Sequence, residues 1–179
     1  MKIKVSELFY SLQGEGRFVG VPSVFLRTYG CNFTCAGFGC KPGERSEEAD
    51  FIDPKQYRIY EELPLVNTGC DSYASWHPNF KQFSPMMTVD EIVKKLTALT
   101  PNNRWQQDNG NNVHLVITGG EPMLQKNIQR LLYNYSDVFK WTQIESNGTS
   151  HQLIPYGTTL VCSPKCSEKN GKPIKYLEP

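Results

Sequence analysis

Cysteine side chains are the residues of this chain best suited to hold an electron-transfer group. Cys31 and Cys35 are separated by Asn-Phe-Thr, and the next thiols follow at Cys40 and Cys70. Three thiolates around an iron–sulfur cubane leave one iron without a protein ligand, and that iron can hold a small molecule. A structural zinc site is the alternative, but zinc sites usually show two close cysteine or histidine pairs, and no second pair is visible. The spacing therefore favours an iron–sulfur cluster.

The residues alone leave the third cluster ligand open between two candidates. Cys40 is nearer, and the Ala-Gly-Phe-Gly segment before it is flexible enough to bring it round. Cys70 is remote, but the entropy cost of loop closure grows slowly with length, so distance does not exclude it. The last two cysteines need no metal. Cys162 ends an apolar run and is expected to be a small buried side chain, whereas Cys166 lies in a polar stretch and is expected to be a free thiol.

Glycine-rich and charged segments supply further candidates for binding. Thr-Gly-Gly-Glu-Pro at residues 118–122 reads as a strand-to-helix turn, in which two glycines let backbone carbonyls approach a ligand ammonium closely. Ser-Leu-Gln-Gly-Glu-Gly at residues 11–16 reads as a polar loop. Arg27 is a charge inside an apolar strand, and a buried arginine needs a partner, either a structural carboxylate or that of a substrate. The three histidines have no spacing suited to a shared metal or a nucleophilic dyad.

The elements that must position these residues alternate between strands and helices. Apolar runs predict strands at residues 23–28, 114–118, 142–146 and 159–163. A capping box at residues 88–91 opens a helix that stops at Pro101, and a second amphipathic helix is expected over residues 123–135. This alternation indicates an α/β fold with a mostly parallel sheet. Every chemical motif falls at the C-terminal end of a strand, where such folds place their sites.

Length and composition limit the class of protein. A chain of 179 residues fits one globular domain, with polar residues 41–69 as an insertion folded over the surface. A net charge of +1 and scattered basic residues predict no nucleic-acid partner. No apolar stretch approaches the roughly 20 residues needed to cross a bilayer. The first residues also lack a secretory signal, so we expect a cytoplasmic protein without a membrane partner.

Together, these motifs resemble the radical S-adenosylmethionine (SAM) superfamily and, within it, the 7-carboxy-7-deazaguanine synthase family of queuosine and 7-deazapurine biosynthesis. The similar segments, in the family's order, are residues 8–16, 25–32, 118–122, 145–149 and 163–165. The Gln-Gly-Glu-Gly loop and the Ser-Pro-Lys turn narrow the match below superfamily level. The resemblance implies a partial (β/α) barrel of radical SAM type. Family members continue for a few more strands, so we expect the C-terminal part of that barrel to be missing here.

The resemblance also implies the metal ligands. In the family, Asp-Thr directly follows the last cluster cysteine, with Tyr and Trp shortly after, and residues 70–76 read Cys-Asp-Ser-Tyr-Ala-Ser-Trp. The implied ligands of a [4Fe–4S] cluster are Cys31, Cys35 and Cys70. Cys40 is then a spectator, and the insertion separates the second ligand from the third. Ser72 takes the place of a threonine whose hydroxyl is expected near Mg²⁺, a cation that prefers oxygen ligands.

Contacts to two small molecules follow from the same resemblance. The residues implied for SAM are Gly120, Ser163, Pro164 and Lys165. The residues implied for a pterin substrate are Leu12, Gln13, Gly14, Glu15, Arg27 and Thr118. An arginine presents a fixed fork of donors, so Arg27 would grip the substrate carboxylate through two bonds.

The implied reaction converts 6-carboxy-5,6,7,8-tetrahydropterin to 7-carboxy-7-deazaguanine with loss of ammonia, which makes the enzyme a carbon–nitrogen lyase. The reduced cluster passes an electron to the sulfonium of SAM, and the resulting 5′-deoxyadenosyl radical abstracts a hydrogen from the pterin before SAM is regenerated. An electron donor such as flavodoxin is expected, and a homodimer is compatible with this function. Two alternatives stay open: an activase that makes a glycyl radical on a partner protein, and a non-catalytic zinc- or cluster-binding protein. The activase would share the cysteines but has no need of Gln13, Glu15 and Arg27.

Overall fold

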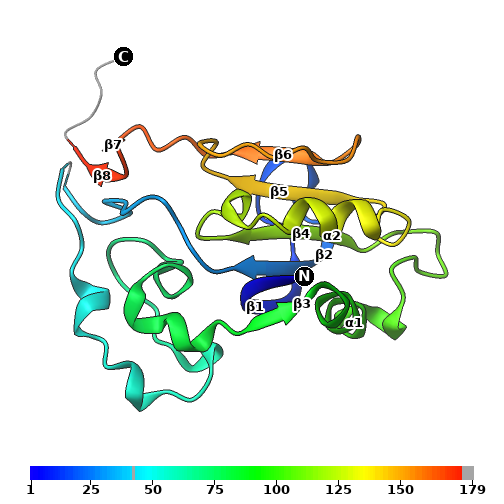
Figure 1. Cartoon of the computed structure of the whole chain (residues 1–179), viewed down its shortest axis with the longest axis horizontal. Helices are drawn as coiled ribbons and strands as arrows, with labels where there is room; N and C mark the ends of the chain where they lie inside the picture. The colour runs from blue at the N-terminus through cyan, green and yellow to red at the C-terminus, as the bar shows by residue number, and fades with distance from the viewer. Residues whose placement is uncertain (42, 175–179) are drawn as a thin grey trace.

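A six-stranded sheet forms the centre of the computed structural model, which describes residues 1–41 and 43–174 (Figure 1). The strand order is β3-β1-β2-β4-β5-β6. The strands are β1 (Lys2–Leu12), β2 (Pro22–Thr28), β3 (Met86–Thr88), β4 (His114–Gly119), β5 (Thr142–Ser146) and β6 (Thr159–Cys162). Strands β2, β4, β5 and β6 run parallel, whereas β1 pairs antiparallel with both β2 and β3. The predicted α/β fold with a mostly parallel sheet is therefore confirmed.

Strand β1 was absent from the predicted strands. Its first residues alternate between charged and apolar, a period that fits a strand, and Ile3 and Val5 are buried. It continues to Leu12, which pairs with Pro22. The expectation of a polar loop from residue 11 onward was therefore wrong at its first two positions, because pairing with β2 extends the strand past its apolar part.

The two α-helices confirm one prediction and shorten the other. Helix α1 (Val89–Leu99) begins with the expected capping box: Thr88 Oγ1 accepts from the Glu91 amide at 3.2 Å, and Glu91 Oε2 accepts from the Thr88 amide at 2.7 Å. Helix α2 (Ile128–Asn134) begins later than predicted. A 3₁₀ turn, η8 (Pro122–Leu124), comes first and ends at Gln125, whose backbone is extended.

The two faces of the sheet have different coverings. Side chains alternate along a strand, so Leu26 of β2 and Ile144 of β5 point into the main core beneath α1 and α2. Both helices lie on the viewer's side of the sheet in Figure 1. Phe25 and Arg27 of β2 point the other way, as does Glu145 of β5. The helix-free face is therefore available for a site.

The insertion does more than cover the surface. Its three 3₁₀ turns are η2 (Glu48–Phe51), η3 (Pro54–Gln56) and η4 (Tyr60–Glu62). They pack on two turns that follow Cys70, η5 (Tyr73–Ser75) and η6 (Pro78–Phe83). A second, smaller core results, with Tyr73, Ala74 and Phe80 buried at its centre and Ile52, Leu63 and Val66 against them.

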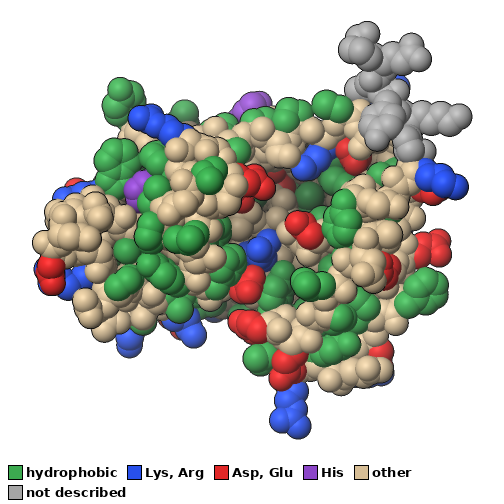
Figure 2. All heavy atoms as spheres, turned by 180° about the vertical axis from the view of Figure 1, so that it is seen from behind, with side chains coloured by type: hydrophobic (Ala, Val, Ile, Leu, Met, Phe, Trp, Pro, Cys, Tyr) green, Lys and Arg blue, Asp and Glu red, His purple; other side chains and the backbone are tan. Residues whose placement is uncertain are grey.

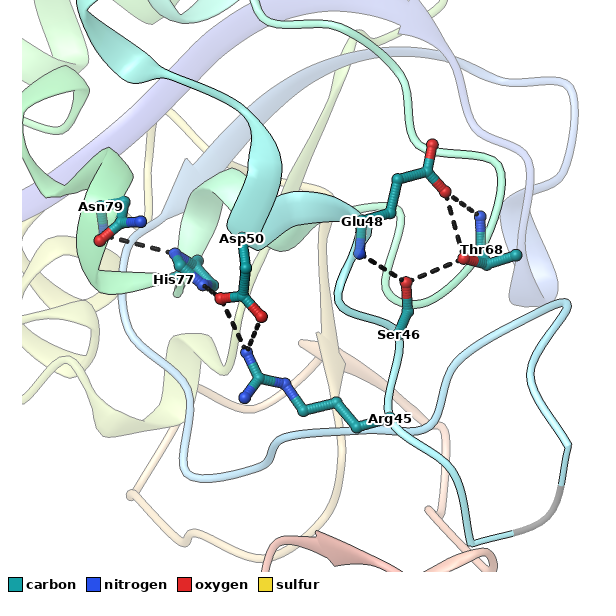
Figure 3. A network of polar contacts seen from close by, with 7 residues as sticks. All are labelled: Arg45, Ser46, Glu48, Asp50, Thr68, His77 and Asn79. Atoms are coloured by element: carbon teal, nitrogen blue, oxygen red, sulfur yellow. Dashed lines mark hydrogen bonds and ion pairs between the residues drawn. The ribbon is translucent and has the colours of Figure 1, made fainter.

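Polar contacts tie this smaller unit together (Figure 3). Glu48 accepts from the backbone amides of Asn67 and Thr68, each at 2.9 Å. Asp50 pairs with Arg45 at 3.0 Å and with the buried His77 at 2.7 Å. Because His77 Nδ1 accepts from a backbone amide, its Nε2 is the nitrogen that donates to Asp50. Both ends of the insertion are thereby fixed to the segment after Cys70.

The remaining described elements are short. Three-residue 3₁₀ turns lie at η1 (Gly16–Phe18) and η7 (Pro101–Asn103). Strands β7 (Glu168–Lys169) and β8 (Lys172–Pro173) form an antiparallel hairpin. Within residues 1–41 and 43–174, no helix combines the length and the apolar character that crossing a membrane requires.

Candidate functional site

A cavity of about 600 Å³ opens on the helix-free face, where strands β2, β4 and β5 end. Its volume lies within the range of small-molecule sites. Figure 2 shows this face, which is hollowed near its middle and carries acidic and basic side chains around the hollow. The cysteine loop, the segment after Cys70 and the turn before β7 complete the wall. Segments from both ends of the chain therefore meet here.

Three of the six thiols line the cavity as the resemblance implies: Cys31, Cys35 and Cys70. Cys40 is half-buried outside the lining, and Cys166 is exposed at the rim. Cys162 is exposed, so the expectation that it is buried was wrong. The reason is that β6 is an edge strand with alternating exposed residues and no element over that side.

A short crossing of backbone brings Cys70 to the cysteine loop. Phe38 and Gly69 exchange two hydrogen bonds, of 2.9 Å and 2.7 Å, so the two ends of the insertion lie side by side. The crossing requires glycine, because a Cβ at Gly37 would lie 2.0 Å from the Gly69 carbonyl oxygen, and Gly37 has a φ of +72°. The long sequence separation between Cys35 and Cys70 thus disappears in space.

The environment of the thiols favours their neutral form until a metal binds. Burial, and secondly the Glu168 carboxylate, raises the pKa of Cys35 to about 12. Burial also raises the pKa of Cys31 and of Cys70. Among the described residues, no three metal-binding side chains are close enough to share one ion. Three thiols spread over one cavity wall suit a multi-iron cluster better than a single zinc ion, and loading it must release protons.

The glycine turn after β4 packs directly against the start of the cysteine loop. Gly120 lines the cavity, and a Cβ there would lie 2.4 Å from the Gly30 carbonyl oxygen. The Glu121 amide donates to the same oxygen at 2.7 Å. Bulk at Gly120 would therefore displace the residue next to Cys31. A valine there would disturb the cluster loop together with any cofactor contact.

Glu121 is a site residue that sequence reasoning did not assign. It is fully buried, and its carboxylate accepts from the Ser146 hydroxyl at 2.9 Å and from the Asn147 amide at 2.7 Å. Asn147 in turn donates to Asn32 in the cysteine loop at 3.0 Å. This network joins the ends of β4 and β5 to the loop between Cys31 and Cys35. The only sequence signal was that Glu121 and Asn147 lie inside recognised motifs.

Arg27 lines the cavity and already has partners. Its Nε donates to Glu7 at 3.0 Å, and its Nη1 donates to the Ser72 hydroxyl at 2.9 Å. The structural ion pair that the sequence left open thus exists, and Glu7 was not foreseen. Ser72 also donates to Asp71 at 3.1 Å. In this arrangement a guanidinium occupies the oxygen suggested for Mg²⁺, so the residues as placed do not fit that ion.

The other residues expected to bind substrate divide into two groups. Glu15 and Thr118 line the cavity, whereas Leu12, Gln13 and Gly14 do not. The buried Gln13 instead donates from Nε2 to Glu145 at 3.0 Å and accepts from the Glu15 amide at 2.9 Å. Gln13 therefore holds two acidic residues that face the cavity. Glu145 was missed as a contact, although it lies in a motif that the resemblance includes.

The Ser-Pro-Lys turn closes one side of the cavity. Ser163, Pro164 and Lys165 all line it, and Lys165 Nζ donates to Ser163 Oγ at 3.0 Å. Gly120 lies across the cavity wall from a different strand end. The four residues implied for SAM are thus brought to the same space as the three thiols.

Comparison with known proteins adds relatives of one kind. No protein-family model matches the chain. The 7-carboxy-7-deazaguanine synthase of Halobacterium salinarum is 33% identical over 164 residues, which are 91% of this chain and 46% of that protein. The enzyme of the same name from Rickettsia prowazekii is 31% identical over 175 residues, 97% of this chain and 56% of that protein. The chain thus spans about half the length of the curated relatives it matches.

A solved structure supports the fold. The crystal structure of QueE from Escherichia coli matches 97% of this chain and 64% of its own, with a TM-score of 0.57 and 23% sequence identity. At that identity the match shows a shared fold. The sequence matches add the relationship: over more than nine tenths of its own length, this chain is a relative of the 7-carboxy-7-deazaguanine synthases.

Proposed function

We propose that the protein catalyses the radical SAM ring contraction of 6-carboxy-5,6,7,8-tetrahydropterin to 7-carboxy-7-deazaguanine, with release of ammonia. The observation that carries this proposal is the meeting of three thiols, the glycine turn and Arg27 on one cavity. Its sequence relatives carry the name of this activity. The cavity has the volume to hold small molecules, and no further domain is needed to build its thiol wall.

Cys31, Cys35 and Cys70 would hold a [4Fe–4S] cluster, and Gly120 with Ser163, Pro164 and Lys165 would surround SAM. When bound, the cluster and SAM supply the one-electron chemistry that starts the reaction. The chain's own part is to fix the cluster through the buried Glu121 network and to cover the adenosyl group with the Ser-Pro-Lys turn. Reduction of the cluster calls for an electron donor, for which a flavodoxin is our proposal.

The substrate would lie between Arg27 and the acidic side chains of Glu15 and Glu145. Arg27 offers a cation for the pterin carboxylate, and the acidic groups accept from the amino and amide edge of the ring. Gln13 contributes by holding Glu145 and Glu15 in place. Thr118, at the end of β4, adds a hydroxyl to the same wall.

We further infer that the sheet is a partial barrel of radical SAM type in one domain, with residues 41–69 as its insertion. The mostly parallel strand order and the site at the strand ends support this assignment. A magnesium ion near Ser72 would require Arg27 to release the Ser72 hydroxyl, because the guanidinium donates to that oxygen. Substrate capture by Arg27 is one way to free it, so Mg²⁺ is proposed only for the substrate complex.

Anaerobic reconstitution with iron and sulfide, followed by assay with SAM, a reductant and the carboxypterin, tests the function. We expect a brown protein that forms 7-carboxy-7-deazaguanine and returns SAM unconsumed. A protein that cleaves SAM but leaves the pterin unchanged would favour a different radical SAM activity, such as the glycyl-radical activase. A protein that binds only zinc, or a cluster without SAM cleavage, would refute an enzyme of this class.

A further inference from the structure

The β7–β8 hairpin holds the cysteine loop on both sides of Cys35. The Gly171 carbonyl oxygen accepts from the Thr34 amide at 2.7 Å, and Glu168 Oε1 accepts from the Ala36 amide at 3.2 Å. Both neighbours of Cys35 are thus fixed by the hairpin. Figure 1 shows the hairpin at the left edge, beside the segment that follows β2.

The turn of the hairpin has the sequence and geometry that this contact needs. Asn170 and Gly171 connect the paired residues Lys169 and Lys172, and both have positive φ, 54° and 74°. Asn-Gly is the preferred pair for a two-residue hairpin turn of this kind. A Cβ at Gly171 would lie 2.4 Å from the Asn32 carbonyl oxygen, so any side chain there would push the hairpin off the loop.

Glu168 is placed unusually for a residue that only stabilises a hairpin. Its side chain is buried, with 7% of the residue exposed. Oε1 accepts from Ala36 and from the Ser167 hydroxyl, but Oε2 is buried and has no hydrogen-bond donor among the described residues. Burying a carboxylate oxygen without a donor costs free energy. Folding stability alone therefore gives no reason for a glutamate beside Cys35.

We propose that Glu168 is a positioning residue for the iron–sulfur cluster: through the Ala36 amide it fixes the backbone that carries the Cys35 sulfur. This inference rests on the proposed function, because it requires Cys35 to be a cluster ligand. Groups that orient metal ligands from outside the ligand shell typically change metal affinity by about 10- to 100-fold when removed. The same hairpin also closes the cavity, since the preceding Ser-Pro-Lys turn lines it.

The test compares variants of the whole protein after anaerobic reconstitution. Glu168→Ala removes the acceptor for Ala36, and Glu168→Gln keeps an oxygen that can accept. Lys169→Ala is the matched control, because Lys169 is an exposed neighbour on the same hairpin. Two properties are measured: the rate of iron loss to a chelator, and the electron paramagnetic resonance spectrum of the reduced cluster. We expect Glu168→Ala to lose iron about 10-fold faster with an altered spectrum, and Glu168→Gln and Lys169→Ala to retain iron like the unaltered protein.

Unchanged iron retention and an unchanged spectrum in Glu168→Ala would overturn the inference, even if its melting temperature fell. If Glu168→Ala does not fold, Glu168→Asp replaces it, because the shorter side chain cannot reach Ala36 and should lose iron equally fast. Failure of the unaltered protein to assemble a cluster would refute the proposed function and this inference with it. Assembly in the unaltered protein without any effect of Glu168→Ala or Glu168→Asp would refute this inference alone.

Discussion

Arg27 illustrates how one residue can have a structural and a binding role together. Nε is bound to Glu7 and Nη1 to Ser72, which fixes the side chain along the cavity wall. A guanidinium has five donor hydrogens, so these two contacts leave donors for a carboxylate. The partner needed by a mostly buried cation is thus present before any substrate arrives. A fixed fork of donors loses little freedom when it binds.

Replacing Arg27 by alanine tests its binding role. Removing one partner of a buried charged hydrogen bond costs on the order of 2–5 kcal/mol, so we expect pterin turnover to fall strongly. Cleavage of SAM without substrate should persist, because the thiols and the glycine turn are untouched. Arg17→Ala is the matched control, since Arg17 lies beside Phe18 outside the cavity lining. Equal loss of both activities would show a purely structural arginine, and normal pterin turnover would remove Arg27 from the substrate site.

The cavity thiols predict a pH dependence of the metal-free protein. The pKa of Cys35 is raised to about 12 in the folded protein, from an ordinary value of 9.0. A raised pKa means that the folded state favours the neutral thiol, so this stabilising contribution is complete below pH 9 and is lost as pH rises toward 12. We expect urea midpoints of the metal-free protein to fall over that interval, and to fall less in Cys35→Ser. An identical pH profile for Cys35→Ser would contradict the assignment.

Among the elements, the backbone crossing at Phe38 and Gly69 has the largest effect on the site. It closes the insertion at its base and leaves Cys70 on the cavity wall. Glycines at positions 37 and 69 allow the approach, because both adopt positive φ and both lack a Cβ. Cys40 lies just past the crossing and outside the lining. The insertion therefore changes the sequence spacing of the thiols without changing where they meet.

The crossing makes a direct prediction for the third ligand. Cys70→Ala should abolish the absorbance of the reconstituted cluster and reduce bound iron, whereas Cys40→Ala should leave both unchanged. Iron and sulfide content per chain, measured after desalting, provides the comparison. The reverse pattern would make Cys40 the ligand and would require the loop around Gly37 to rearrange.

At the scale of the whole molecule, the cavity lies between two packed units. The larger core fixes β2, β4 and β5 under helices α1 and α2. The smaller core, centred on Phe80, fixes the segment that carries Cys70. The walls of the cavity come from both, so its shape depends on how well each unit is packed.

Truncating Phe80 tests this dependence. Phe80 is fully buried and contacts Tyr73 edge to face, with ring centroids 5.0 Å apart. Phe80→Ala should lower the free energy of unfolding by about 3–5 kcal/mol, the usual cost of such a cavity. We also expect reduced cluster retention, because the unit that carries Cys70 is loosened. Urea denaturation and iron content measure the two effects. Full stability and full iron content would show that the smaller core does not support the site.

Sequence patterns were sufficient for the elements with strong local signals. The strands that end at Thr28, Gly119 and Ser146 follow from apolar runs, and the Thr88 capping box marks the start of α1. Because parallel strands place their C-terminal ends at one edge, the motifs after them had to lie near one another. The sequence also contained the motifs that relate the chain to its family, which is why the fold class and the proposed chemistry could be predicted.

Only the tertiary structure decided which side chains touch. Gln13 was expected to meet the substrate, yet its amide points to Glu145, 132 positions away. The partners of Arg27 and of Glu121, and the clasp of Glu168 on the cysteine loop, are likewise contacts between distant segments. Periodicity reports the face on which a residue lies, but a hydrogen bond depends on register, strand order and rotamer at once. Those are fixed by the packing of the whole chain, and so no local pattern could reveal them.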